Sequence, residues 1–119
     1  MTEYDYTKLL LEHFRNPKNL GKLENYDIVT TEKSPKCGDT ITFYIKFDQD
    51  KIKDISFESF GCAANIASSS VLSVMAKGKT IEEVKKITQK DIVKELGGLP
   101  SEKFHCSALA ITTINSAIK

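Results

Sequence analysis

The chain has 119 residues, of which 40% are hydrophobic and 28% are charged, and this balance excludes the apolar-poor composition of a disordered protein. Its formal net charge is only +1, with lysines scattered among nearly as many acids, so we expect no binding of nucleic acid or of an anionic membrane. The acidic N-terminus is unlike a signal peptide, and no apolar run approaches the roughly 20 residues that cross a bilayer. These features predict a single cytoplasmic domain over residues 1–119.

The first expected element is an amphipathic helix at about residues 4–15. Its periodic residues recur at intervals of three and four, and they are Tyr6, Leu9, Leu10, His13 and Phe14. Asp5 or Thr7 is expected near the start of this helix. Residues 16–21, with the sequence NPKNLG, then end it, because a residue before proline avoids helical backbone angles. We interpret His13 as a packed or capping residue rather than a ligand.

A small antiparallel sheet is expected at about residues 22–60. Residues 41–48 alternate strictly between apolar and polar side chains, and residues 55–58 resume this alternation after a polar turn at residues 48–51. The apolar side of the two strands is formed by Ile41, Phe43, Ile45 and Phe47 and by Ile55 and Phe57. This pattern predicts a hairpin, and the β-forming residues 28–30 favour a further, weaker strand.

Helices are expected at about residues 63–118. The first has an apolar stripe ended by Gly78, the second begins at a capping box formed by Thr80 and Glu83, and the third begins near Thr88. The stripe of the first comprises Ala63, Ile66, Ala67, Ser70, Val71, Val74 and Met75, and that of the last helix comprises Leu109, Ile111, Ile114, Ala117 and Ile118. Strands followed by helices predict an α+β domain whose helices cover one face of the sheet.

The three cysteines each fall at the end of an expected element. An odd number of cysteines in a chain without a secretion signal argues against a disulfide framework. Cys37 precedes the clearest strand, Cys62 lies at the junction of a strand and a helix, and Cys106 lies where the last helix begins. A helix N-terminus favours an anion, so the last two positions favour the thiolate, which is the form that binds metals and attacks electrophiles.

Other potential ligands stand beside two of these cysteines. Asp39 follows Cys37 after one glycine, and His105 precedes Cys106, which makes five potential ligands for a site that needs four. Soft thiolates select zinc, copper(I) or an iron-sulfur cluster, and a [2Fe-2S] cluster takes four protein ligands. Each short motif by itself is more often a turn or a packing contact. Together the three cysteine positions indicate either a metal site or a reactive thiol site, and the residues alone leave both open.

Four motifs resemble those of one family. They are HFRNPKNLG, SPKCGD, GCAANIASSS and LPSEKFHCS, and they occur in the family's order from about Tyr6 to the end of the chain. The chain thus resembles the IscU/NifU-type iron-sulfur cluster assembly scaffolds. This resemblance implies a single α+β domain with a three-stranded antiparallel sheet and helices packed on one face.

The resemblance also implies a function. Such a scaffold is not an enzyme: a [2Fe-2S] cluster is assembled on it from iron and from persulfide sulfur made by a cysteine desulfurase, and is then transferred to apo-proteins. Cys37, Cys62 and Cys106 match the cluster cysteines, Asp39 and His105 match two accessory ligand positions, and Cys106 matches the persulfide acceptor. The labile cluster and its iron are the expected cargo, and zinc can occupy the same residues in such scaffolds.

The implied partners are a cysteine desulfurase, apo iron-sulfur proteins as recipients, and frataxin-like or ferredoxin proteins. The scaffold is expected to be a monomer or a homo-oligomer bridged by the cluster. Residues 99–103 have the sequence LPSEK where many members have Leu-Pro-Pro, and this more polar, less extended segment puts docking of an Hsp70-type chaperone in doubt.

Two other classes of function stay open. One is a zinc-dependent sulfurtransferase-type relay, but the relatives of that kind carry an insertion between the second and third cysteine motifs and lack the histidine at position 105. A simple Cys-His nucleophile is disfavoured too, because adjacent residues at a helix start usually point their side chains apart, which places His105 badly as a base for Cys106. The other class is a structural zinc domain, which would unfold when its metal is removed.

Overall fold

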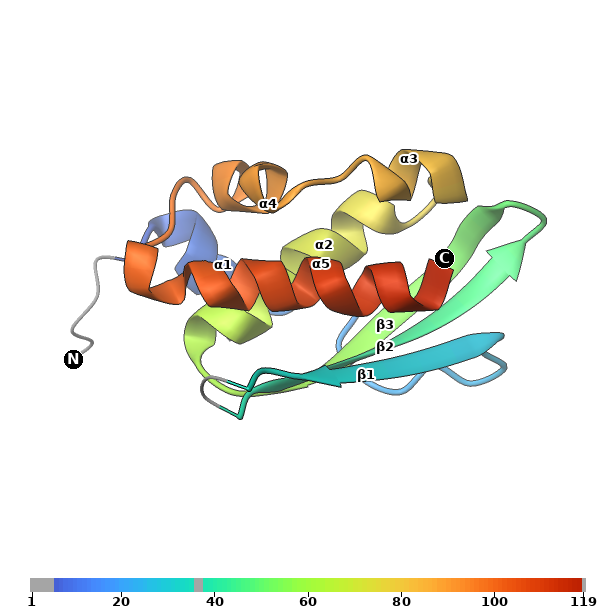
Figure 1. Cartoon of the computed structure of the whole chain (residues 1–119), viewed down its shortest axis with the longest axis horizontal. Helices are drawn as coiled ribbons and strands as arrows, with labels where there is room; N and C mark the ends of the chain where they lie inside the picture. Colours follow the sequence, from blue (N-terminus) through green and yellow to red (C-terminus); the bar gives the residue numbers. More distant parts are fainter. Residues whose placement is uncertain (1–5, 36–37, 119) are drawn as a thin grey trace.

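The computed structural model describes residues 6–35 and 38–118. A three-stranded antiparallel sheet in the order β1-β2-β3 is formed by β1 (Ile28–Lys33), β2 (Thr40–Asp48) and β3 (Lys51–Phe60). The α-helices of the described chain lie on one face of this sheet (Figure 1). The predicted α+β fold is therefore confirmed, and the weakly signalled first strand is longer than residues 28–30.

The alternating apolar residues of the β2–β3 hairpin form the core, as predicted. Ile41, Phe43 and Ile45 of β2 are fully buried, as is Phe57 opposite Phe43 on β3. The two rings pack with centroids 6.3 Å apart. The pairing register shifts between Lys46 and Phe47, a bulge that interrupts the alternation, so Phe47 is only partly buried.

The opposite face of the sheet is crossed by the segment of residues 16–27. It first pairs with the free edge of β3, where the backbone N–H of Gly21 donates to the carbonyl of Phe57 at 2.8 Å. It then passes below the sheet in Figure 1 and reaches β1 at its start. The ring of Tyr26 packs on Tyr44, with centroids 5.4 Å apart, so Tyr44 is buried although it points away from the helices.

Helix α1 (Lys8–Arg15) begins directly after Thr7, which is one of the two residues expected near its start. Thr7 has an extended backbone and its side-chain oxygen accepts a hydrogen bond from the N–H of Leu10 at 3.0 Å, so Thr7 is the cap and the helix cannot extend back through it. Leu10 anchors the helix in the core, where it is fully buried.

Helix α2 (Ala63–Ala76) is the central helix. It contacts α1, β3, α4 and α5, so it is buried on most sides rather than along one stripe. The predicted stripe is wrong at Val74, which is 49% exposed, whereas four serines are buried. Those serines are Ser68, Ser69, Ser70 and Ser73. Their small side chains let the neighbouring elements approach the helix closely.

Two short helices and one long helix complete the layer. The predicted capping box of Thr80 and Glu83 begins α3 (Ile81–Lys85), and Thr88 caps α4 (Gln89–Glu95). A single 3₁₀ turn, Ser101–Lys103, leads directly into α5 (Phe104–Ile118). Helix α5 lies beside α2 and packs on β1 and β2 (Figure 1).

Residues of the HFRNPKNLG segment contact helix α2 at Ser70 and Ser73, which we call the serine face of α2. The hydroxyl of Ser70 lies 2.8 Å from Nδ1 of His13 and accepts a hydrogen bond from the backbone N–H of Lys18 at 2.9 Å. The Asn19 side chain donates to the Ser73 hydroxyl at 3.0 Å. His13 is therefore a packed residue, as predicted, and burial followed by the charge of Lys18 lowers its pKa.

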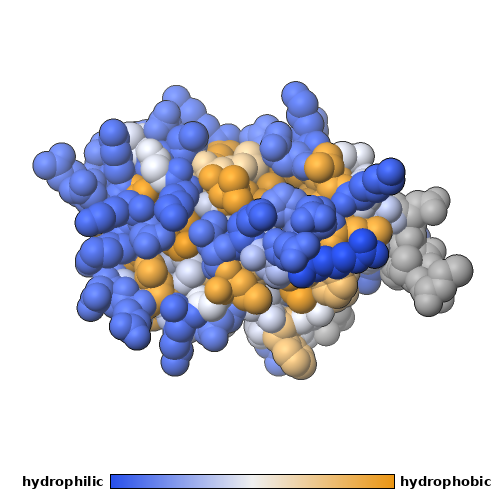
Figure 2. Space-filling model, turned by 180° about the vertical axis from the view of Figure 1, so that it is seen from behind, coloured by the Kyte–Doolittle hydropathy of each residue, from blue (hydrophilic) through white to orange (hydrophobic). Residues whose placement is uncertain are grey.

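Among the described residues, no helix combines the length and the apolar character needed to cross a bilayer. On the face seen in Figure 2, hydrophilic side chains predominate and hydrophobic ones form separate small areas. Two aromatic side chains are among the exposed hydrophobic residues: Phe60 at the end of β3 is 78% exposed and Phe104 at the start of α5 is 43% exposed.

Candidate metal centre

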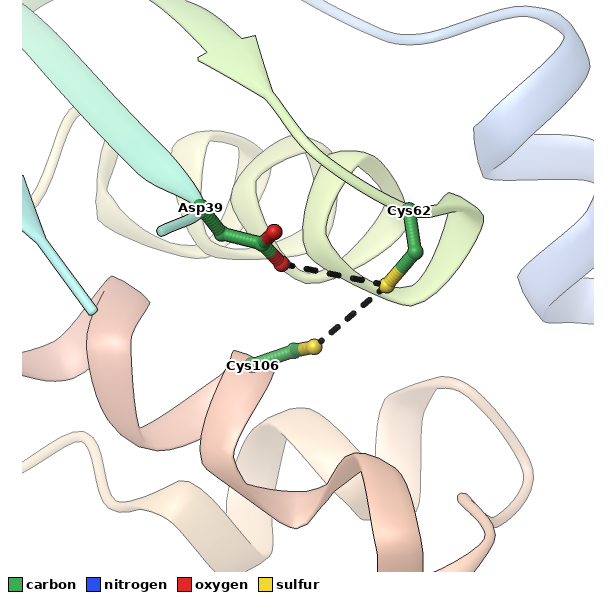
Figure 3. Close-up of side chains that lie close together, drawn as sticks. All are labelled: Asp39, Cys62 and Cys106. Carbon is green, nitrogen blue, oxygen red and sulfur yellow. Dashed lines mark hydrogen bonds between the residues drawn. The ribbon is translucent and has the colours of Figure 1, made fainter. Parts of the chain in front are cut away.

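Three potential ligands from distant parts of the chain point toward one another (Figure 3). They are Asp39, Cys62 and Cys106, which we call the metal corner, and their ligand atoms all lie within 4.8 Å of one another. The two sulfur atoms are 3.6 Å apart, and the sulfur of Cys62 is 4.0 Å from Oδ2 of Asp39. Asp39 precedes β2, Cys62 caps α2, and Cys106 lies in the first turn of α5.

Backbone hydrogen bonds between Ser34 and residues 38 and 39 hold Asp39 in place. The backbone N–H of Ser34 donates to the carbonyl of Asp39 at 2.8 Å, and the N–H of Gly38 donates to the carbonyl of Ser34 at 3.0 Å. Gly38 has φ +77°, in the left-handed region that favours glycine.

Gly61 makes room for the Asp39 carboxylate. A Cβ atom at position 61 would lie 2.5 Å from Cγ of Asp39, a distance that side chains do not adopt. Glycine is therefore needed here for space, because the carboxylate lies directly against the backbone that leads into Cys62.

The two thiols differ in acidity. Cys62 lies at the N-terminus of α2, and its pKa is lowered to about 5. The largest cause is the hydrogen bond that its sulfur accepts from the Cys106 thiol. Nearby backbone N–H groups and the charge of Lys103 also favour the anion, whereas burial opposes it. The pKa of Cys106 is raised, because it donates that hydrogen bond and is buried beside the negative charges of Cys62 and Asp39. These opposite shifts favour loss of the first proton of the pair from Cys62 rather than from Cys106.

His105 lies at the edge of the metal corner. Its Nε2 is 3.6 Å from the sulfur of Cys106, so the expectation that these adjacent side chains point apart is wrong. Both residues lie in the first turn of α5, and the imidazole is long enough to fold back toward its neighbour. A pocket of about 430 Å³ between the end of β1 and α5 reaches His105, which leaves this side of the site open.

The structure therefore brings together Asp39, Cys62 and Cys106, with His105 in contact with Cys106. The remaining predicted ligand, Cys37, lies outside the described residues. Sequence reasoning missed Asn65, a fully buried amide close to the corner. The signal that could have identified it is a large polar residue among the small residues of GCAANIASSS.

The spacing of these atoms suits a metal ion. Two thiolates bound to one metal at about 2.3 Å in tetrahedral geometry lie roughly 3.8 Å apart. The two sulfurs here are 3.6 Å apart, so little movement is needed for both to bind one ion. Two thiols and a carboxylate match the preferences of iron in clusters and of zinc.

Comparison with known proteins gives a consistent result. The protein family described as "NifU-like N terminal domain" matches residues 5–119. A relative from Archaeoglobus fulgidus, "Iron-sulfur cluster assembly scaffold protein IscU 1", is 51% identical over 113 residues, which is 95% of this chain and 74% of the relative. The IscU scaffold protein of Aquifex aeolicus is 45% identical and covers 98% of this chain and 75% of its own length.

Longer relatives and solved structures agree with this. The nitrogen fixation protein NifU of Trichormus azollae is 43% identical over 97% of this chain, which corresponds to 41% of that protein. A crystal structure from Fervidobacterium islandicum, of a protein described as a scaffold candidate for the SUF system, has a TM-score of 0.81 at 27% identity and covers 96% of both chains. The N-terminal part of a NifU-like protein from Brucella abortus has a TM-score of 0.74 at 26% identity and covers 94% of this chain and 90% of its own.

Proposed function

The chain belongs to the NifU-like N-terminal domain family, and from this premise we propose that it assembles a [2Fe-2S] cluster at the metal corner and releases it to apo-proteins. Its relatives are named as cluster-assembly scaffolds, and the same role, rather than that of an enzyme, holds for this chain. The observation that carries the proposal is the 3.6 Å separation of the Cys62 and Cys106 sulfurs beside the Asp39 carboxylate.

The proposed ligand set combines geometry with sequence. Cys62, Cys106 and Asp39 are proposed as ligands because they already lie at ligand spacing. His105 is proposed as an exchangeable ligand because its ring reaches Cys106, and Cys37 is proposed from its sequence motif alone. Carboxylate and imidazole hold iron less firmly than thiolate, so a cluster with one such ligand can be bound and still leave. Zinc would be held by the same residues.

Cys106 is the proposed sulfur acceptor. The Cys106 thiol gives its proton to the Cys62 thiolate, and the Cys106 thiolate then attacks the terminal sulfur of the desulfurase persulfide, which forms a new S–S bond on Cys106 and leaves the desulfurase cysteine as a thiolate. The competing acceptor is Cys62, because its lowered pKa favours the thiolate. Mass spectrometry after incubation with desulfurase and cysteine separates the two: added sulfur on Cys106 is expected, and its undiminished presence in Cys106→Ser excludes this assignment.

The proposed partners follow from the cargo. They are a cysteine desulfurase, apo iron-sulfur proteins and a frataxin-like or ferredoxin protein, acting in the cytoplasm. The segment Leu99–Lys103 ends in a 3₁₀ turn that runs directly into α5, so an Hsp70-type chaperone would have to unwind it to bind it as an extended peptide. This geometry disfavours docking of such a chaperone, as does the sequence of the segment.

The decisive experiment is anaerobic reconstitution with desulfurase, cysteine and ferrous iron, followed by transfer to an apo-ferredoxin. Visible absorption with equal amounts of iron and acid-labile sulfide is expected on the chain, and then on the acceptor. A chain that takes up zinc but forms no cluster, and that unfolds when a chelator removes the zinc, would instead be a structural zinc domain.

A further inference from the structure

Asn65 is a fully buried polar residue on α2, three residues after Cys62. Its Nδ2 donates a hydrogen bond to the hydroxyl of Ser59 at 2.9 Å and lies 3.4 Å from the carbonyl oxygens of both Thr40 and Phe60. Thr40 and Phe60 are paired at the end of the β2–β3 ladder. One amide group therefore contacts both strands where they leave the sheet.

The orientation of this amide follows from its surroundings. Two carbonyl oxygens and a hydroxyl lie around Nδ2, so an oxygen in its place would face two acceptors. The other amide atom, Oδ1, is buried and accepts no hydrogen bond from the described residues. The contacts of Nδ2 alone therefore hold the amide in place, and an apolar side chain at this position would lose all three of them.

The strand ends that Asn65 joins carry two of the proposed ligands. Asp39 immediately precedes Thr40, and Gly61 and Cys62 follow Phe60. A Cβ atom at Gly61 would lie 2.8 Å from Nδ2 of Asn65 and 2.7 Å from Oδ2 of Asp39, so the amide and the carboxylate lie against the same glycine. The backbone N–H of Asn65 also donates to the carbonyl of Cys62 at 3.0 Å.

We propose that Asn65 is a positioning residue for the metal corner. Its amide fixes the end of the β2–β3 ladder, so that Asp39 and Cys62 stay at ligand spacing before any metal arrives. Asn65 acts through the backbone of Thr40 and Phe60 and is not itself a ligand. This inference rests on the proposed function in one respect, since it assumes that the bound metal is cluster iron.

Binding of Co²⁺ alone tests this role, because the visible and near-ultraviolet bands of thiolate-bound Co²⁺ report both affinity and ligand arrangement. Asn65→Ala is expected to bind Co²⁺ about tenfold more weakly than the native chain and with altered bands. Ser59→Ala removes only the partner of the amide and is expected to weaken binding about threefold. Because both changes break the same contact, the double variant should bind no more weakly than Asn65→Ala.

Ser73→Ala is the matched control, since Ser73 is equally buried on the same helix but hydrogen-bonds Asn19 at the other end. It should lower the thermal midpoint and leave the Co²⁺ affinity and bands native. Native Co²⁺ binding by Asn65→Ala overturns the proposal, and so does an equal loss of affinity in Ser73→Ala. If Asn65→Ala does not fold, Ser59→Ala decides: native affinity in that variant overturns the positioning role.

Failure of this inference is distinguishable from failure of the proposed function. If the native chain forms no cluster while Co²⁺ binding still depends on Asn65, the scaffold function is wrong and the positioning role stands. If clusters form equally on the native chain and on Asn65→Ala, with equal Co²⁺ affinity, the scaffold function stands and the positioning role is wrong.

Discussion

The two ends of α2 use polar residues in opposite ways. At the serine face, the hydroxyls of Ser70 and Ser73 are paired with His13, Lys18 and Asn19, which join α1 and the following segment to the core. At the other end, Cys62 shares its contacts with the two other members of the metal corner. Polar groups satisfied within the protein fix its tertiary structure, whereas groups gathered without a full set of partners are available to bind cargo.

The largest expected effect comes from removing a thiol of the metal corner. Cys106→Ser should form almost no cluster under anaerobic reconstitution, because a hydroxyl is a poor substitute for a thiolate on iron. Iron and acid-labile sulfide per chain are the measurement. Ser107→Ala, at the next and equally buried position, is the control and should reconstitute normally. A full cluster on Cys106→Ser would contradict its assignment as a ligand.

The opposite end is tested by Ser70→Ala. This change leaves Nδ1 of His13 and the backbone N–H of Lys18 without their shared partner, so it should lower the free energy of unfolding by about 2 kcal/mol. Denaturation in urea provides the measurement. The half-buried Ser116→Ala is expected to change stability by no more than about 0.5 kcal/mol. A changed Co²⁺ affinity in Ser70→Ala would show that the two ends of α2 are not independent.

A smaller effect is expected from Gly61→Ala, which perturbs the metal corner without removing a ligand. The new Cβ displaces the flexible Asp39 carboxylate, so Co²⁺ binding should weaken about tenfold while the folded state persists. With a cluster bound, Gly61→Ala should resemble Asp39→Ala, in which we expect slower transfer to apo-ferredoxin because the exchangeable carboxylate is lost. Transfer as fast as in the native chain would show that Asp39 does not control release.

The smallest effect concerns pH at the serine face. The pKa of His13 is lowered in the folded state, chiefly by burial and then by Lys18, against the opposing charges of Glu12 and Glu95. The unfolded chain therefore takes up this proton first, and stability is full above about pH 6.5 and falls as the pH drops toward the lowered folded pKa.

In His13→Asn, which can keep a hydrogen bond to Ser70, this contribution to the pH dependence should disappear. Urea denaturation at pH 7.5 and pH 5 measures it, as the difference between the native chain and the variant. An equal loss of stability on acidification in both proteins would mean that His13 does not titrate with folding.

Much of the fold could be predicted because its signals are local. The alternating residues that predicted β2 and the capping box at Thr80 each depend on near neighbours in sequence, and the strand and the capping box were both confirmed. Thr7, one of the two residues expected near the start of α1, is its N-cap. The exposure of Val74 was not predicted correctly, since it depends on what surrounds α2.

The residues of the candidate site likewise fall into those that local sequence identifies and those whose role depends on the folded structure. Thiols at the ends of elements could be recognised as potential ligands from the sequence, and Cys62 and Cys106 do meet. The roles of Gly61 and Asn65 could not, because a steric limit and a hydrogen bond to two strands depend on chain segments that only the folded state brings together. The contact between His105 and Cys106 likewise depends on a rotamer, which sequence spacing does not determine.

The members of the metal corner are separated by 23 and 44 residues along the chain, so an unfolded chain cannot hold them together. Any metal that binds them is bound by the folded form alone and shifts the folding equilibrium, by about 2.7 kcal/mol when free metal is at 100 times its dissociation constant. A loaded scaffold should thus resist proteolysis longer than an empty one. Delivery of the cargo would itself shorten the scaffold's lifetime, which links the abundance of the protein to the supply of iron and sulfur.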